Sequence, residues 1–160
     1  MIKTFLLLVS HFIMLIVGFS LGVYALPIII ASQMPVTEVA MTVGDELRYE
    51  GEFVRDLKDS DFLHWGEGKV TLTQTQFQLD GKLAPGPNYK LYFSPVFVET
   101  EMEFEQHKEK MAVAGDVSRF ENVVVQLAEG VNPADYSAVI IWCEAFSEFI
   151  TATRYELVEG

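Results

Sequence analysis

Cysteine is almost absent from this sequence: Cys143 is the single one among 160 residues. One cysteine cannot form a disulfide within the chain, so the fold must be stabilised by packing, and any disulfide would join two chains. One cysteine and three histidines also fall short of a structural zinc pattern. There is no Cys-x-x-Cys-His motif, which excludes the usual covalent attachment of haem.

Basic residues are scarce as well. Lysine and arginine number 11 against 23 acidic residues, and every acidic residue lies at or after Glu38. Only Lys3 precedes that point, so the rest of the chain carries 10 minus 23, or −13. A field of this sign argues against nucleic acid and anionic lipid head groups as partners.

The common catalytic motifs are missing too. The sequence has no nucleophile elbow, phosphate-binding loop, paired-histidine metalloprotease motif or dinucleotide fingerprint. A thiol-dependent hydrolase or transferase would need Cys143 as nucleophile and His64 or His107 as base, brought together by the fold. The sequence therefore leans away from an enzyme without deciding the question.

Charge is missing from Thr4 to Thr37, and this stretch contains the longest apolar run. As a helix, the 22 residues Phe5–Leu26 would be about 33 Å long, the hydrocarbon thickness of a bilayer. We predict that residues 1–31 form an uncleaved signal-anchor, with a cleaved secretory signal as the alternative. Lys3 favours the cytoplasmic side for the N-terminus. The expected location is the inner (plasma) membrane, crossed once, with the C-terminal domain extracytoplasmic or periplasmic.

The rest of the chain is predicted to contain a tether, residues 32–46, and one domain, residues 47–160. Short segments rich in β-branched and aromatic residues recur there, separated by turn signals, and no convincing amphipathic helix interrupts them. We predict an all-β domain, a small β-sandwich or barrel of about eight short strands. The expected strands are 47–54, 69–77, 89–94, 98–105, 111–117, 122–127, 139–143 and 149–157.

The segment Val98–Glu105 alternates apolar and acidic residues without a break. On a strand its four glutamates would share one face and follow each other about 6.8 Å apart. They lack the Asp/Asn/Gly loop chemistry usual for Ca²⁺. We predict a solvated edge strand rather than a calcium site.

The segment Val139–Trp142 is β-branched or aromatic throughout, which predicts a strand buried on both faces. Alternation places Val139, Ile141 and Cys143 on one face and Ile140 and Trp142 on the other. Cys143 stands at the end of this strand, where a thiol can be either packed or presented to a ligand. Glu144 and the apolar neighbours favour a packed, protonated thiol.

Several motifs occur in a particular order along the chain. They are His64-x-Gly66-x-Gly68, Ala84-Pro85-Gly86-Pro87-Asn88-Tyr89, Asn132-Pro133-Ala134-Asp135-Tyr136-Ser137, and Val139-Ile140-Ile141-Trp142-Cys143-x-x-Phe146. This order resembles the electron-transfer DM13 domain, a small extracytoplasmic β domain, over about Gly51 to Leu157. The Gly86-Pro87 and Ile141-Trp142-Cys143 motifs are the most specific.

The resemblance implies a redox role for Cys143, either as a free thiol or as the residue that holds a prosthetic group such as haem. For haem, His64 is the leading candidate for the second ligand, ahead of Met102, Met111 and His107. The resemblance also implies a redox partner protein in the envelope, besides the membrane contacted by the N-terminal helix. The alternative is an envelope binding or structural domain in which Cys143 is only packed.

Overall fold

The computed structural model describes residues 2–33 and 48–158. The predicted tether, residues 32–46, therefore lies almost wholly outside the described residues. The elements are α1 (Ile2–Gln33), β1 (Arg48–Phe53), β2 (Gly66–Leu72), β3 (Gln76–Leu83), β4 (Tyr89–Ser94), α2 (Glu101–His107), the 3-10 turn η1 (Lys108–Lys110), β5 (Ala112–Val117), β6 (Glu121–Gln126), the 3-10 turn η2 (Pro133–Asp135), β7 (Ala138–Cys143) and β8 (Glu148–Val158).

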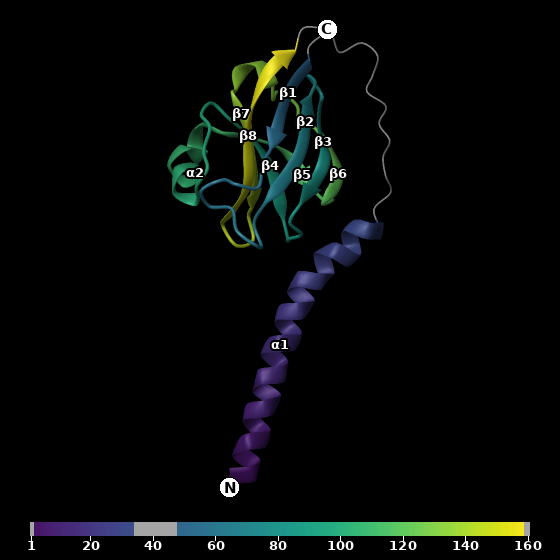
Figure 1. Cartoon of the computed structure of the whole chain (residues 1–160), viewed down its shortest axis with the longest axis vertical. Coiled ribbons are helices and arrows are strands. Elements are labelled where there is room, and N and C mark those ends of the chain that lie inside the picture. Colours follow the sequence, from purple (N-terminus) through teal and green to yellow (C-terminus); the bar gives the residue numbers. More distant parts are fainter. Residues whose placement is uncertain (1, 34–47, 159–160) are drawn as a thin grey trace.

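The N-terminal segment is one long helix, α1, which projects away from the strands (Figure 1). Its part Ile2–Val23 is long and apolar enough to cross a membrane, and none of it is buried by the protein. Length and composition alone do not separate a membrane anchor from a signal sequence. The helix agrees with the prediction of an apolar N-terminal helix.

The eight strands form one antiparallel sheet in the order β5-β4-β7-β8-β1-β2-β3-β6. Strand β8 is 11 residues long and pairs with β7 through its first part and with β1 through its last. The two outer strands approach each other: Ala128 N–H donates to Ala114 O at 2.8 Å, and a Cβ on Gly115 would lie 2.5 Å from Val125 Cγ1. The sheet is thus a nearly closed barrel, and the all-β prediction is confirmed.

Strand β7 is buried along its whole length, as the sequence predicts. Val139, Ile141 and Cys143 belong to the core inside the barrel. Ile140 and Trp142 belong to a second apolar cluster on the outer face. Both faces of β7 are covered, because one points into the barrel and α2 packs over the other.

The outer cluster is centred on one aromatic stack. The rings of Phe104, from α2, and Trp142 are parallel within 10° and their centroids are 3.8 Å apart. Tyr92 meets Phe104 edge-on, with 5.0 Å between centroids. This packing anchors α2 to the β4-β7-β8 part of the sheet.

The predicted edge strand at Val98–Glu105 is wrong, because a helix begins at Glu101. Thr100 caps it: the Thr100 hydroxyl accepts a hydrogen bond from Glu103 N–H at 3.1 Å, and the Glu103 carboxylate accepts one from Glu99 N–H at 2.9 Å. This Thr-x-x-Glu pattern is a helix-start signal that the alternation concealed. Met102, which the alternation places opposite the glutamates, is 78% exposed.

The predicted strand 69–77 is also divided in two. Strand β2 ends at Leu72 and β3 begins at Gln76, with a tight turn between them. The Thr73 hydroxyl accepts from Gln76 N–H at 3.1 Å, and Thr73 N–H donates to Gln76 O at 2.9 Å. Threonine therefore ends the strand through a side-chain turn, although its propensity alone favours extended structure.

Candidate functional site

The strand end that carries Cys143 meets the loop that leads into β4. Cys143 and Tyr89 are paired across β7 and β4. The Cys143 thiol donates to Pro87 O at 3.2 Å, and Glu144 N–H donates to Asn88 O at 3.1 Å. The two motifs most specific to the resembled family, Gly86-Pro87 and Ile141-Trp142-Cys143, are therefore in direct contact.

A cavity of about 560 Å³ opens beside this contact. Its volume is in the usual range for small-molecule sites, about 300–1,000 Å³. Most of its walls are apolar, and they come from loops and strand ends at one end of the barrel and from α1. The lining residues are Phe19, Ser20, Val23, Leu63, His64, Pro85, Gly86, Pro87, Tyr89, Cys143, Phe146 and Ile150.

Both residues singled out from the sequence, Cys143 and His64, line this cavity. The Asp61 carboxylate accepts from Leu63 N–H at 2.7 Å and from His64 N–H at 2.8 Å, which shapes the loop that carries the imidazole. It also lies 3.1 Å from His64 Nδ1. When Nδ1 donates to Asp61, the lone pair of the neutral ring is on Nε2, which can then accept a proton or bind a metal.

The environment of Cys143 favours the protonated thiol. The residue is 2% exposed, and burial is the main cause that raises the pKa of its thiol. The carboxylates of Glu148 and Glu144 raise this pKa further, whereas the backbone N–H groups of Phe146 and Ala145 act against them. The sulfur is thus held as a neutral hydrogen-bond donor, and a reactive thiolate would need the opposite surroundings.

This arrangement does not fit haem ligation through Cys143. A cysteine ligand binds iron as a thiolate. Here the S–H group donates to the Pro87 carbonyl, and the nearby charges that act on the thiol are negative. Cys143 and His64 have the right donor types, but their setting keeps the sulfur protonated.

The weaker ligand candidates lie elsewhere. Met102 and His107 are on α2, and Met111 packs against the outer cluster. Two of these residues are on the element that covers the outer face of the sheet, and none of the three lines the cavity. Within residues 2–33 and 48–158, no group of three or more His, Cys, Asp or Glu side chains is placed to hold a metal ion.

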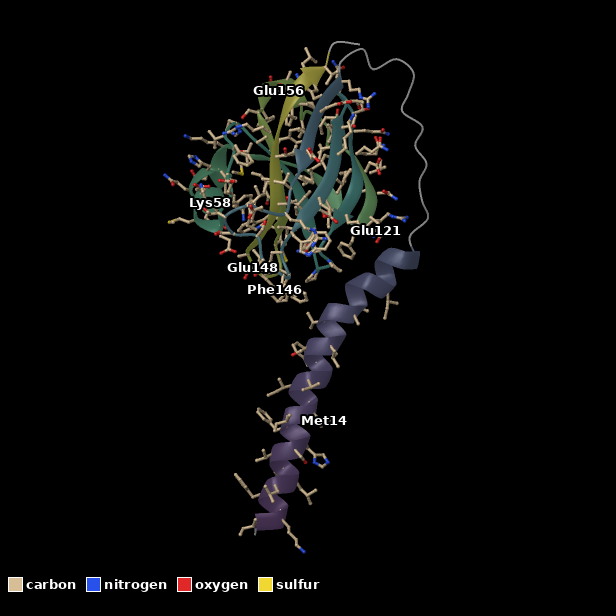
Figure 2. All side chains as sticks on the ribbon, viewed as in Figure 1. Met14, Lys58, Glu121, Phe146, Glu148 and Glu156 are labelled. Atoms are coloured by element: carbon tan, nitrogen blue, oxygen red, sulfur yellow. The ribbon has the colours of Figure 1, made fainter. Side chains whose placement is uncertain are left out.

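The sequence alone does not predict most of the cavity walls. Phe146 and Tyr89 belong to sequence motifs, and Phe19 and Val23 belong to an apolar helix, but neither pattern indicates a shared cavity. Phe146 lies at the end of the barrel that faces α1, on the turn between β7 and β8 (Figure 2). The one signal for these walls was the contact-rich Pro-Gly-Pro loop, because close backbone approach is a common use of glycine. A Cβ on Gly86 would lie 2.3 Å from the Tyr89 hydroxyl.

A family model described as "Electron transfer DM13" matches residues 56–155, more than half of the chain. The matched stretch begins in the segment after β1, extends into β8, and includes every cavity residue of the barrel. No curated protein and no solved structure matched.

Proposed function

The chain belongs to the electron transfer DM13 family, and from this premise we propose that it is a membrane-anchored redox domain whose working site is the Cys143 cavity. The observation that carries the proposal is the meeting of Cys143 and His64 in one mostly apolar cavity. Family membership supplies the redox class. The cavity supplies the place where a sulfur atom and a basic nitrogen can act together.

We assign residues 1–31 to a signal-anchor, residues 32–46 to a tether and residues 47–160 to the extracytoplasmic domain. The apolar surface of α1 supports the anchor because a helix without a protein cover is stable in lipid. Lys3 supports a cytoplasmic N-terminus. In a bacterial cell the domain would then lie on the periplasmic side of the inner membrane.

In this proposal Cys143 is the group that changes oxidation state. Because burial and nearby carboxylates keep its thiol protonated, oxidation of the sulfur must release a proton. His64 Nε2 is suited to accept that proton, since the pairing of Nδ1 with Asp61 leaves the lone pair on Nε2. The oxidant is a disulfide of a redox partner protein in the envelope. The Cys143 sulfur forms a mixed disulfide with one partner sulfur, the partner's S–S bond breaks, and the released partner thiolate takes the proton from His64.

The test uses the full chain in detergent micelles, equilibrated with glutathione buffers of set redox ratio. Mass spectrometry measures the reduced and oxidised fractions of Cys143, and absorbance and metal analysis of the same sample detect a chromophore. We expect a reversible transition whose approach to equilibrium, followed over time, is slower in His64→Gln and unchanged in His107→Gln, whose imidazole is outside the cavity. The Cys143→Ser variant, which has no thiol, is the negative control. A sulfur that stays reduced at every ratio, in a protein without colour, would contradict the redox role.

The burial of Cys143 favours a second candidate function. A cysteine that is 2% exposed and hydrogen-bonded to a backbone carbonyl has the properties of a packed residue. The domain would then be an envelope binding or structural module. An unchanged phenotype in Cys143→Ser, with any loss confined to stability, would favour this candidate.

A further inference from the structure

The cavity is at the end of the barrel that faces α1. Its outer wall includes Phe19, Ser20 and Val23 of α1, and the part of that helix that is long and apolar enough to cross a membrane, Ile2–Val23, ends there. Val23 is four positions after Phe19, about 6 Å along a helix axis. If α1 is the anchor proposed above, the cavity mouth lies at the boundary between acyl chains and head groups of the outer leaflet.

The loops around the mouth expose large apolar side chains in the same place. Phe62 is 89% exposed, Phe146 57% and Leu63 49%. Leu63 and Phe146 line the cavity itself, and Phe62 shares a neighbouring hollow with Leu63 and Pro85. Aromatic and leucine side chains of interfacial proteins enter the outer about 5–10 Å of the bilayer, and these exposed side chains are of that kind.

The charge of the domain limits which lipid can approach. The chain after Lys3 carries −13, and Asp61 and Glu148 flank the rim loops. Anionic head groups are repelled by this field, so a zwitterionic lipid meets the rim at lower cost. None of the described residues that line the cavity is a lysine or arginine that could hold a phosphate.

We propose that the cavity binds an acyl chain of a membrane lipid, which enters from the outer leaflet past Leu63 and Phe146. The walls are suited to a hydrocarbon chain because they are mostly apolar, and the volume is that of a small-ligand site. The lipid chain would lie against Cys143 and Ile150. The proposal rests on the anchoring and on the cavity of the proposed function, and it needs no redox step.

The experiment places the full chain in nanodiscs of phosphatidylcholine that contain a fraction of phosphatidylcholine with a photoreactive diazirine on one acyl chain. After illumination, mass spectrometry maps the cross-links. We expect them on the buried cavity walls of the barrel, at Tyr89, Cys143 and Ile150. Cross-links confined to α1 and to the exposed rim residues Phe62, Leu63 and Phe146 would show lipid contact at the surface only and would overturn the proposal.

Two matched variants of α1 provide a second test of the lipid site. Ser20 and Ser10 each hydrogen-bond to a carbonyl of their own helix, but only Ser20 lines the cavity. Ser20→Phe puts a ring into the space expected for the lipid chain and should lower cross-linking to Tyr89, Cys143 and Ile150 severalfold. Ser10→Phe should leave it unchanged, and an equal effect of both variants would also overturn the proposal.

The experiments distinguish a failure of the lipid-site proposal from a failure of the proposed redox role. Cross-linking does not need the thiol, so it should persist in Cys143→Ser. The glutathione titration is done in micelles and needs no phosphatidylcholine. Loss of the titration with intact cross-linking removes the redox role alone, and the reverse result removes the lipid site alone.

Discussion

The Cys143 thiol donates a hydrogen bond to the carbonyl oxygen of Pro87, 56 residues earlier in the chain, at 3.2 Å. This bond joins the end of β7 to the loop before β4, and it orients the S–H group toward the backbone. A thiol held in this way is protected in its neutral form. Its chemistry therefore depends on what removes its proton.

The reaction of Cys143 with iodoacetamide should be slow and shifted to high pH. Burial and the charges of Glu148 and Glu144 raise the pKa of this thiol, and the thiolate is the form that reacts. The comparison protein carries Met102→Cys together with Cys143→Ser, so that its single thiol is at a position that is 78% exposed. We expect Cys143 to react severalfold more slowly at pH 8 and its rate to rise at higher pH than the comparison. Equal pH profiles would contradict the assigned surroundings.

Glu148→Gln should move the pH profile of the Cys143 reaction with iodoacetamide back toward lower pH, because it removes one of the charges that disfavour the thiolate.

The raised pKa of the Cys143 thiol also affects the stability of the domain. In the unfolded chain the thiol ionises near its ordinary value of 9.0, whereas the folded protein resists ionisation. The free energy of unfolding should therefore fall as pH rises above that value, and less so in Cys143→Ser. Denaturant titrations at pH 8 and pH 10 measure the difference.

Phe104→Ala should destabilise the domain by about 3–5 kcal/mol, the usual cost of removing a fully buried ring. Phe104 is wholly buried and stacks on Trp142, so its loss leaves a cavity under α2. Met102→Ala, on the same helix but exposed, should change stability by less than about 0.5 kcal/mol. Chemical denaturation of both variants gives the comparison, and similar losses would show that α2 does not pack as described.

Thr100→Ala should cost about 1 kcal/mol, because it removes the hydroxyl that accepts from Glu103 N–H at the start of α2. Thr100→Ser keeps the hydroxyl and should restore most of the loss. Urea denaturation of the three proteins measures the effect. If serine and alanine are equally destabilising, the cost arises from the lost methyl group and not from the cap.

Gly68→Ala should cost more than about 2 kcal/mol, from steric overlap and backbone strain together. Gly68 has φ +125°, and a Cβ there would lie 2.3 Å from Asp80 O on the paired strand β3. Gly130 also has positive φ, at +85°, but a Cβ there meets nothing within 4 Å. Gly130→Ala therefore isolates the backbone cost, about 1 kcal/mol. Thermal and urea unfolding should separate the two variants clearly.

Local sequence patterns predict an element correctly where its packing in the folded chain favours the same structure. The period-two faces of Val139–Cys143 are confirmed because one face packs inside the barrel and the other beneath α2. The segment Val98–Glu105 shows the opposite case. Its alternation favours a strand, but the Thr100 cap and the contact of Phe104 with Trp142 favour a helix and outweigh it. Both interactions are formed only in the folded chain.

The sequence by itself determined the apolar helix, the all-β class, the acidic field and the identity of the buried central strand. These depend on composition and on short-range periodicity, which every residue carries with it. Only the tertiary structure decided that His64 and Cys143 share a cavity, that Pro87 accepts from the thiol, and that α1 closes one wall. Those relations join residues 56 to more than 120 positions apart, and no local pattern encodes which distant strand ends a barrel brings together.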